Sequence, residues 1–590
     1  MIPILIKESN KIKYFVSCSF IFLLISSCGN DKQMSQKNEE NSRPNIILIM
    51  SDDMGYSDIG CYGGEIQTPN LDNLAKNGIR FTQFYNAARC CPTRASLLTG
   101  LYPHQAGMGW MTGISGENPS YQGDLSKKSM TLSEVAKSAG YSTFMTGKWH
   151  VSKNVKADGP KDSWPLQRGF DRYYGTIQGA GNYYDPATLC RDNTLITPFI
   201  DDQYPSKDYY YTDAISNEAS RFIKERDKAS PFFLYMPYTA AHWPMQAKPR
   251  DIEKYKGVYD AGWEDIRKKR LNKMKALGIL TKNTELSPLN THPWSEEILK
   301  DVESGRMEVY AAMIDAMDQG IGRVLETLKT EGIYENTIIL FLQDNGGCAE
   351  EIGTEGKTGP WASSPDELKP LAKDEIEYNV IPRVTRQGKP IMKGKDIKGG
   401  PETSYVAYGQ PWANVSNTPF REFKHWVHEG GIATPLIVHY PKMIKNNNSL
   451  NPFPSHIIDI MPTMVELMGA KYPKTKDGEA IPPMEGISLV PFFKGEKAQR
   501  EGPIYWEHEM NRAVRWGDWK LVSKGELLDG AYAKWTNSKL GKWELYNIAE
   551  DRSELHDLAG QYPDKVKLMS EMWDDYAERI SVFPNPWHPK

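Results

Sequence analysis

The chain has 590 residues, of which 39% are hydrophobic and 25% charged, and its formal net charge is -4. This composition is typical of a soluble globular protein, and the lack of a basic excess argues against a nucleic-acid partner. The length allows several domains, although one large α/β sheet can absorb much of such a chain.

The N-terminus predicts export. Three lysines precede an apolar run over 15–25, and Ile25-Ser26-Ser27-Cys28 follows. The run is too short for a transmembrane helix and fits a signal peptide. Its end resembles a bacterial lipobox with a lipid on Cys28, while a plain secretory signal is the alternative. We therefore expect a lipoprotein signal peptide over 1–27, a polar flexible tether over 28–44, and lipid anchoring in the bacterial cell envelope, in the periplasm or on the outer-membrane surface.

The first mature segment predicts a buried strand with an acidic end. Residues 45–51 form a continuous apolar run, typical of a strand covered on both faces. It ends in Asp52-Asp53, and two adjacent carboxylates there are costly unless something compensates their charge. A divalent cation would do so, and a solvated turn is the alternative.

Strands and helices then alternate along the chain. A capping box at 131–134 opens a helix that ends near Gly140. Helical spacing also predicts helices over 71–77, 212–226, 307–328 and 456–468, and apolar runs predict strands over 141–146, 231–237, 337–342 and 435–439. Residues 248–305 and 349–415 lack firm periodicity, so they are either insertions that shape a pocket mouth or plain surface loops.

This alternation predicts a mostly parallel sheet covered by helices on both faces. Ligand groups gather beyond the carboxyl ends of the strands in such sheets. Polar residues follow four of the predicted strands, so one site is expected to contain Asp52-Asp53, Lys148 with His150, His242, and Asp344-Asn345.

The pattern of predicted elements changes near residue 482. Short strands are expected within 504–506, 512–522 and 543–546, followed by a helix over 566–579. We expect a catalytic domain over 45–481 and a small C-terminal α+β subdomain with an antiparallel sheet over 482–590.

The most specific motif begins at Cys90. Cys90-Cys91-Pro92-Thr93-Arg94 is a C-x-P-x-R sequence, and Ser-Leu-Leu-Thr-Gly follows over 96–100. The stretch resembles the signature of type I sulfatases of the alkaline phosphatase superfamily, in which a maturase oxidises the motif cysteine to formylglycine before export. A helix is expected to start near Ala95, so that Cys90 lies just ahead of an N-terminus that favours anions. A buried structural thiol is the alternative.

The resemblance also implies roles for other residues. Lys424, which precedes Glu429-Gly430-Gly431, matches a second lysine of the family. By this resemblance, one calcium ion is bound by Asp52, Asp53, Asp344 and Asn345, whose oxygen atoms suit a hard cation. Arg94 would hold the nucleophile and the metal ligands, Lys148 and Lys424 would neutralise the sulfate, His150 would assist elimination, and His242 would act as general acid.

The resulting prediction is a sulfuric ester hydrolase for a sulfated carbohydrate or an aryl sulfate. One hydroxyl of the hydrated formylglycine would attack sulfur, and loss of the other hydroxyl's proton would expel sulfate. Alternatives are a phosphate, phosphodiester or phosphonate hydrolase of the same superfamily, and a silent glycan-binding lipoprotein. Sugar contacts are guessed near Trp506, His508, Arg512 and Trp516, and pairing among Cys61, Cys91, Cys190 and Cys348 stays open.

Overall fold

The computed structural model describes residues 43–113, 116–204, 208–525 and 540–586. Residues 1–42, which contain the predicted signal peptide, Cys28 and most of the tether, lie outside the described residues. The described residues from Asn45 onward belong to one compact unit.

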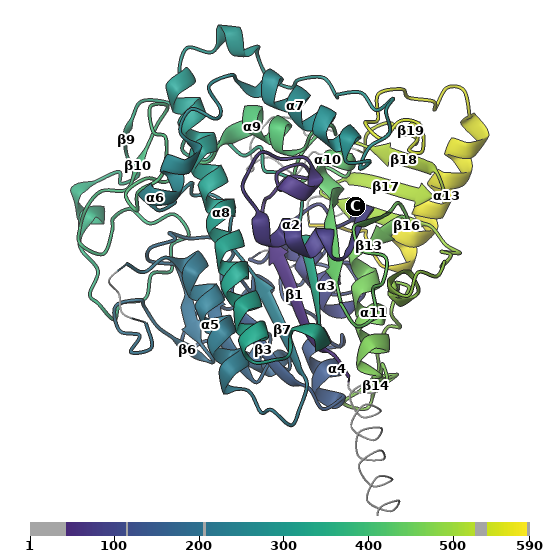
Figure 1. The fold of residues 1–590 in the computed structure, drawn as a ribbon, viewed down its shortest axis with the longest axis horizontal. Coiled ribbons are helices and arrows are strands. Elements are labelled where there is room, and N and C mark those ends of the chain that lie inside the picture. Colours follow the sequence, from purple (N-terminus) through teal and green to yellow (C-terminus); the bar gives the residue numbers. More distant parts are fainter. Residues whose placement is uncertain (1–42, 114–115, 205–207, 526–539, 587–590) are drawn as a thin grey trace, which may run out of the picture. The chain divides into compact units, whose positions relative to one another are not determined.

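A large mixed sheet organises this part of the chain (Figure 1). Its strand order is β12-β2-β11-β8-β1-β7-β3-β4-β5-β6, and β13 pairs with β2 beside β12. The strands are β1 Asn45–Ser51, β2 Ile79–Tyr85, β3 Ser142–Thr146, β4 Arg172–Thr176, β5 Leu189–Arg191, β6 Thr194–Leu195, β7 Phe232–Pro237, β8 Thr337–Gln343, β11 Ala433–His439, β12 Ser449–Asn451 and β13 Ser455–His456.

The strand directions determine what meets at one edge of the sheet. β8, β1, β7 and β3 are consecutive neighbours and run parallel, with Leu48 opposite both Leu340 and Tyr235. β11 runs antiparallel to β8 and to β2, so β2 points the same way as β1. The carboxyl ends of these five strands and the amino end of β11 therefore lie at the same edge.

Each face of the sheet supports its own hydrophobic core. Side chains of a strand alternate between faces, and in β1 Ile47 and Ile49 enter one core while Ile46, Leu48 and Met50 enter the other. The first core also contains side chains of α2 (Pro69–Lys76), α5 (Tyr211–Glu225) and α8 (Lys300–Thr330), and the second those of α3 (Cys90–Thr99), α4 (Leu132–Ser138) and α11 (Ile460–Met468). Burying one such aliphatic side chain contributes about 1.5–3 kcal/mol. The predicted sheet with helices on both faces is confirmed.

Several helices differ from the predicted bounds. The capping box of α4 is present. The helix α8 begins at Lys300, earlier than predicted. Its first turns were not recognised because they bury the polar residues Glu303 and Arg306, which carry no apolar signal. α11 begins at Ile460, since Ile457–Asp459 forms a 3-10 turn. The helix α7, Trp263–Ala276, was missed because two of its five buried residues are the arginines 267 and 270.

The C-terminal region contains the predicted antiparallel sheet. β16 (Ile504–His508), β17 (Asn511–Trp516), β18 (Trp519–Ser523) and β19 (Glu544–Asn547) pair in sequence order. The helix α13, Pro563–Arg579, packs against β17 and β18. Shorter elements complete the fold: α6 Pro249–Ile252, β9 Gly359–Pro360, β10 Met392–Lys393, α9 Gly409–Ser416, α10 Glu429–Ile432, β14 Thr475–Lys476, β15 Glu479–Ala480 and α12 Val490–Phe493.

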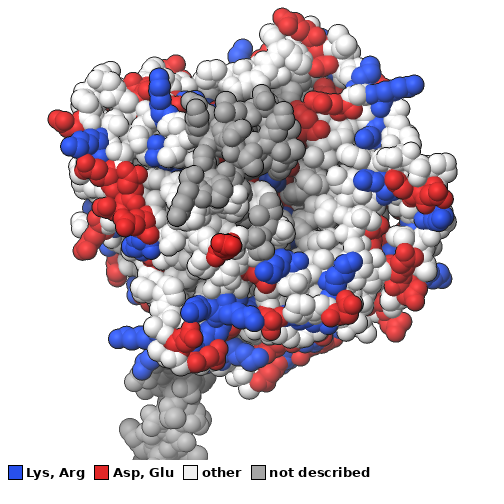
Figure 2. Space-filling view, turned by 180° about the vertical axis from the view of Figure 1, so that it is seen from behind, with Lys and Arg blue, Asp and Glu red and all other residues white. Residues whose placement is uncertain are grey.

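The surface charges, the helices and the cysteines of the described residues add three further observations. On the face shown in Figure 2, lysines and arginines are interspersed with aspartates and glutamates. None of the described helices is long and apolar enough to cross a membrane. The five described cysteines, including Cys61, Cys190 and Cys348, are free thiols, so the structure has no disulfide among the described residues.

Candidate active site

The predicted site residues converge at the edge of the sheet described above. Asp52-Asp53 follow β1, Asp344-Asn345 follow β8, His242 follows β7 by five residues, and Lys148 and His150 follow β3. Cys90 follows β2, and Lys424 precedes β11. Strand order alone thus gathers residues that are separated by as many as 372 positions in the sequence.

Asp52 and Asp344 share the guanidinium of Arg94. Arg94 Nη2 donates to Asp344 Oδ2 at 2.7 Å and to Asp52 Oδ2 at 3.3 Å, and Lys148 Nζ also donates to Asp52 Oδ2. All four side chains are fully buried. A second Arg94 contact, from Nη1 to the carbonyl oxygen of Lys148 at 3.1 Å, fixes the start of the loop after β3.

Asp53 is the centre of a second group of contacts. Lys424 Nζ lies 2.9 Å from each of its carboxylate oxygens, and Asn345 Nδ2 donates to Asp53 Oδ1 at 2.8 Å. His242 Nε2 lies 3.4 Å from Asp53 Oδ2 and 3.5 Å from Lys424 Nζ. The other ring nitrogen of His242, Nδ1, lies 2.7 Å from the carbonyl oxygen of Trp243, so Nδ1 carries a proton. In neutral His242, Nε2 therefore presents its lone pair to Lys424.

Burial and crowding perturb these carboxyl groups in different directions. Burial, with repulsion from Asp344, raises the pKa of Asp52 well above its usual value. Burial also raises the pKa of Asp344 despite the nearby charges of Arg94 and Lys148. For Asp53, His242 and Lys424 outweigh the effect of burial and lower the pKa.

The four oxygen-bearing side chains fit a hard divalent cation. Asp52 Oδ1 and Asn345 Oδ1 are buried and accept no hydrogen bond, which is costly for polar atoms away from water. The set contributes carboxylate and amide oxygens, the donors that Ca²⁺ and Mg²⁺ prefer over the nitrogen and sulfur ligands of zinc. A bound cation would satisfy the two unpaired oxygens and relieve the repulsion between Asp52 and Asp344.

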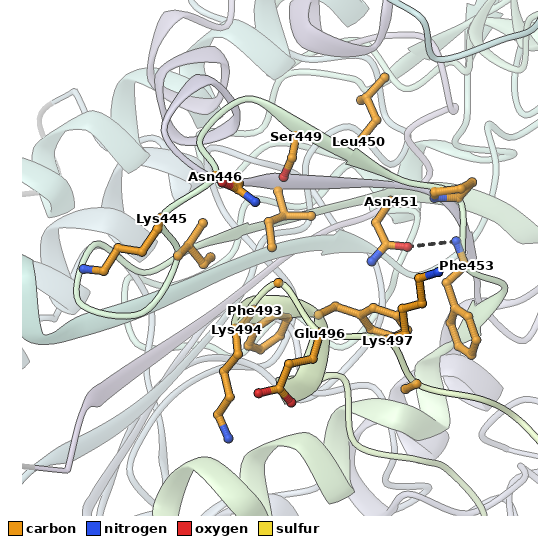
Figure 3. A pocket seen from close by; sticks show the side chains of 16 residues that line it. Lys445, Asn446, Ser449, Leu450, Asn451, Phe453, Phe493, Lys494, Glu496 and Lys497 are labelled. Atoms are coloured by element: carbon orange, nitrogen blue, oxygen red, sulfur yellow. Dashed lines mark hydrogen bonds between the residues drawn. The ribbon is translucent and has the colours of Figure 1, made fainter.

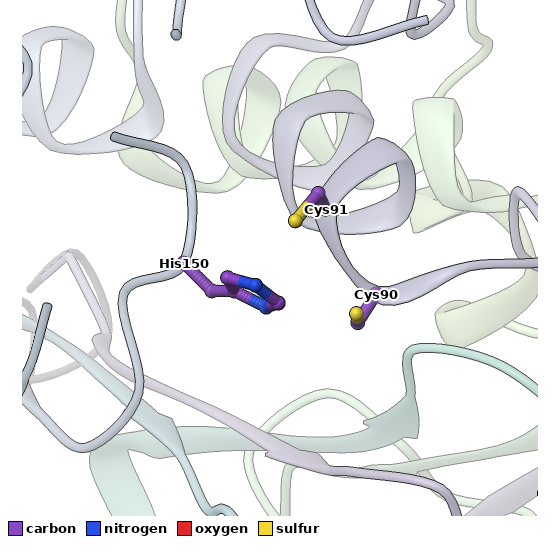
Figure 4. Close-up of side chains that lie close together, drawn as sticks. All are labelled: Cys90, Cys91 and His150. Carbon is purple, nitrogen blue, oxygen red and sulfur yellow. The ribbon is translucent and has the colours of Figure 1, made fainter. Parts of the chain in front are cut away.

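Cys90 faces His150 across a short gap (Figure 4). The sulfur atoms of Cys90 and Cys91 and a ring nitrogen of His150 all lie within 4.8 Å of one another. Cys90 is 1% exposed and is the first residue of α3, so the expected helix start near Ala95 was wrong by about one turn. Pro92 explains the earlier start, because proline is favoured in the first turn of a helix.

The thiol and the imidazole have strongly shifted pKa values. A hydrogen bond from Cys91 and the charge of Lys148 lower the pKa of Cys90 well below its usual value, although burial opposes this. Burial lowers the pKa of His150 to about 4 and that of His242 to about 3, so both imidazoles are neutral near pH 7. His150 and Asp53 have φ values of 58° and 55°, in the left-handed region, which is costly for non-glycine residues and common at functional sites.

Sequence reasoning missed two features of this site. The strand β2, which delivers Cys90, was not predicted, although five of the seven residues of Ile79–Tyr85 are β-branched or aromatic. Arg89 forms a 2.9 Å ion pair with Glu350, a residue of the predicted loop region 349–415. No local pattern indicates that pair, because it joins two loops across the fold.

The guessed sugar contacts do not form one exposed surface. Trp506 and His508 are buried, and Trp506 Nε1 donates to the carbonyl oxygen of Asn86 at 2.7 Å, as in a packing role. Trp516 is 41% exposed. A cavity of about 490 Å³ lies near Phe453, Phe492 and Lys497 (Figure 3). It is lined by Ile79, the first residue of β2, so it lies at the end of that strand opposite to Cys90.

Comparisons with known proteins agree on a family. The model of the family "Sulfatase" matches residues 44–470, and that of "N-sulphoglucosamine sulphohydrolase, C-terminal" matches 421–580. The chain is 33% identical over 580 residues to an uncharacterized sulfatase of Schizosaccharomyces pombe, covering 93% of this chain and 96% of the relative. It is 33% identical over 461 residues to an arylsulfatase of Klebsiella aerogenes, covering 76% and 92%.

A solved structure supports the same assignment. The crystal structure of Ps i-CgsB in complex with k-i-k-neocarrahexaose matches with a TM-score of 0.60 and 25% identity, over 93% of this chain and 94% of that one. The chain belongs to the sulfatase family. It is a sulfatase, an enzyme that hydrolyses sulfate esters, as the resemblance of the C-x-P-x-R stretch implied.

Proposed function

We propose that this sulfatase removes sulfate from a sulfated carbohydrate, with formylglycine formed at Cys90 and one calcium ion bound beside it. The observation that carries the proposal is the convergence of ten side chains of the required types at one edge of the sheet. These are Asp52, Asp53, Cys90, Arg94, Lys148, His150, His242, Asp344, Asn345 and Lys424. Their match to the type I sulfatase pattern supports an aldehyde hydrate at position 90, which would supply a nucleophilic hydroxyl and a second hydroxyl for release of sulfate.

The cation would be held by Asp52, Asp53, Asp344 and Asn345, and it would supply positive charge next to a sulfate oxygen. Lys148 and Lys424 now donate to Asp52 and Asp53. If those carboxylates held a cation, Lys148 and Lys424 would be available to neutralise the sulfate. Arg94 keeps its contact to Asp344 and thereby holds the ligand loop after β8.

We assign the two histidines to different proton transfers, one at position 90 and one at the leaving group. His150, next to Cys90, is neutral and accepts a proton from position 90 during elimination of sulfate. His242 has its Nδ1 proton fixed on the Trp243 carbonyl, so only Nε2 exchanges protons. For His242 to act as general acid, Nε2 has to take up a proton first, and the negative charge of a bound sulfate would favour the protonated imidazole.

A carbohydrate substrate is supported by the similarity to Ps i-CgsB, which was crystallised with k-i-k-neocarrahexaose. The relation to an arylsulfatase supports aryl sulfates as surrogate substrates. Calcium is favoured over zinc because the four proposed ligands contribute carboxylate and amide oxygens, although His242 also lies within 4.8 Å of oxygens of Asp52 and Asp53.

We also propose that the enzyme is exported, matured by a formylglycine-generating partner and anchored through a lipid on Cys28 in the bacterial cell envelope. The sequence over 1–28 supports this proposal. Labelling of the expressed protein with a fatty-acid analogue tests it, and a Cys28→Ala variant is the control that should lose the label.

The decisive experiment for the proposed function is mass spectrometry of the peptide that contains position 90, on protein from a host with active maturation. We expect the mass of formylglycine together with turnover of 4-nitrophenyl sulfate that is lost on chelation and restored by Ca²⁺. An unmodified thiol in a fully active enzyme would disprove the proposed nucleophile.

A further inference from the structure

Two half-buried tryptophans are neighbours of residues in or next to the candidate active site. Trp243 directly follows His242, and the two rings are 4.3 Å apart. Trp110 lies two residues before Thr112, whose backbone N–H hydrogen-bonds to the thiol of Cys91. Trp243 therefore contacts a residue of the candidate active site, and Trp110 belongs to a loop that contacts the residue after Cys90.

A carboxylate fixes the ring of Trp243. Its Nε1 donates to Glu350 Oε2 at 2.7 Å, and the other oxygen of Glu350 lies 2.9 Å from Arg89 Nη2. Arg89 is the residue before Cys90 and the N-cap of α3. This chain of contacts ties the orientation of the indole to the backbone next to the reactive side chain.

A second carboxylate fixes the ring of Trp110 in the same manner. Glu509, in the turn between β16 and β17, accepts from Trp110 Nε1 through Oε1 and pairs with His425 Nδ1 through Oε2. The backbone N–H of His425 donates to the carbonyl oxygen of Ala88 at 2.9 Å. Glu509 is thus tied to the 88–90 segment as well, from the C-terminal sheet.

Glu509 remains charged in this buried position. Burial alone would raise its pKa, but His425 and His508 outweigh burial and lower the pKa to about 2. Arg89 contributes to the same shift, so its charge acts on Glu509 as well as on Glu350.

Trp110 and Trp243 are more exposed than a tryptophan that packs in the core. Trp506 also bonds its Nε1 to the protein, but it is 3% exposed and its faces lie in the core. In Trp110 and Trp243 the Nε1–H is bound while part of the ring stays accessible. An indole of fixed orientation offers an apolar face to the C–H groups of a sugar ring, and charged groups at its rim can accept hydrogen bonds from hydroxyls.

We infer that Trp110 and Trp243, fixed by Glu509 and Glu350, form the recognition site for the alcohol half of the substrate, and that its ligand is a sugar ring. This inference rests on the proposed function and deepens it. It assigns selectivity for carbohydrate sulfates to residues from a loop after α3, a loop after β7 and a turn of the C-terminal sheet.

The test compares two substrate types on matched variants. Trp110→Ala, Trp110→Phe and Glu509→Gln are assayed with 4-nitrophenyl sulfate and with a panel of N-acetylglucosamine 6-sulfate, galactose 6-sulfate and carrageenan oligosaccharides. Trp519→Ala is the control, because Trp519 is half-buried but packs on Tyr562 and Lys565 of the C-terminal region. All variants are checked for formylglycine content and thermal unfolding.

We expect Trp110→Ala and Glu509→Gln to lower kcat/KM for the best sugar sulfate about 30-fold or more, mainly through KM. The loss with 4-nitrophenyl sulfate should be at least tenfold smaller, Trp110→Phe should fall between, and Trp519→Ala should match the wild type on both substrates. If Trp110→Ala does not fold, Trp110→Phe and Glu509→Gln carry the comparison.

Equal losses on both substrate types, or no loss on the sugar sulfate, would overturn the inference. A wild-type enzyme that cleaves 4-nitrophenyl sulfate but none of the sugar sulfates would overturn the sugar ligand and leave the sulfatase chemistry intact. A formylglycine-containing enzyme that cleaves no sulfate ester at all would instead overturn the proposed function.

Discussion

Two clusters of buried charges in this protein look alike but differ in how they are balanced. The first, called the junction cluster, consists of Glu429, Arg515, Lys520, Arg552 and Glu554, and it joins the C-terminal sheet to α10, the short helix before β11. Lys520 Nζ lies 3.0 Å from Glu429 and 2.8 Å from Glu554, and Arg552 lies 3.2 Å from Glu429. Burial raises the pKa of Glu429, but the three cations outweigh it and the pKa is lowered.

The active-site cluster is buried to the same degree and has the opposite balance. Asp52 and Asp344 have raised pKa values in spite of Arg94 and Lys148, and Asp52 Oδ1 accepts no hydrogen bond. In the junction cluster, cations separate the carboxylates. In the active site, the carboxylates crowd one another.

The different balance of charges indicates a different role for each cluster. A buried ion pair with complete partners fixes two elements in register, whereas loss of one partner leaves a costly uncompensated charge. Crowded carboxylates store a cost that a bound cation relieves, as expected where function and stability trade off. Four experiments test whether the two clusters differ in this way.

The largest effect is expected at position 90. Cys90→Ala should lower kcat for 4-nitrophenyl sulfate by at least about 10³-fold, because the nucleophile is lost while binding groups remain. Cys190→Ala, which removes another buried thiol from β5, is the matched control and should keep activity within about threefold. Comparable activity in Cys90→Ala would show that another group attacks sulfur.

The next effect concerns the junction cluster. Lys520→Met should reduce the free energy of unfolding by about 3–5 kcal/mol, since it leaves Glu429 and Glu554 without their shared cation. Denaturant titration measures this change. Lys567→Met, at an exposed pair with Glu571, is the control and should change stability by less than about 0.5 kcal/mol. If Lys520→Met is as stable as the wild type, the junction cluster does not hold the two regions together.

The effect of Ca²⁺ on thermal stability should distinguish the two clusters, because only the active-site cluster is expected to bind the ion. At a concentration 100-fold above its dissociation constant, a ligand specific for the folded state adds about 2.7 kcal/mol of stability. We expect Ca²⁺ to raise the Tm of the wild type and of Lys520→Met equally, and to have little effect on Asn345→Ala. A rise in Asn345→Ala as large as in the wild type would place the cation elsewhere.

The smallest effect is a pH dependence of stability at Glu544, a residue of β19. Burial raises the pKa of Glu544, but the hydrogen bond from His428 and further contacts outweigh burial, so the pKa is lowered to about 2. A carboxyl with a lowered folded-state pKa contributes stability above its unfolded pKa of about 4.3, and this is lost as the pH falls toward 2. After allowance for solvent screening, we expect about 1–2 kcal/mol.

Chemical denaturation between pH 5 and pH 2.5 tests this expectation. Glu544→Gln should show a shallower loss of stability over that range than the wild type. Identical slopes would mean that Glu544 has no stabilising partner in solution.

Much of the fold follows from local patterns, and the errors have physical causes. The continuous apolar runs predicted β1, β7 and β8 because strands buried on both faces carry no polar positions. α7 was missed because arginines occupy its buried face, where Arg270 Nη1 pairs with Asp58 at 2.6 Å. The start of α3 was misplaced because the helix begins two residues before Pro92, a residue that is favoured in the first turn and that marks the start better than Ala95 does.

The sequence by itself determined the chemical types at the site: a C-x-P-x-R cysteine, carboxylates at strand ends, and lysines and histidines in the following loops. These signals are local, because each is a residue type at a fixed offset from a strand or turn. The tertiary structure decided which of these groups meet, since the strand order places β2, β3, β7 and β8 around β1. It alone brings Glu350 and Glu509 to their tryptophans, because contacts between loops depend on the packing of elements far apart in the chain.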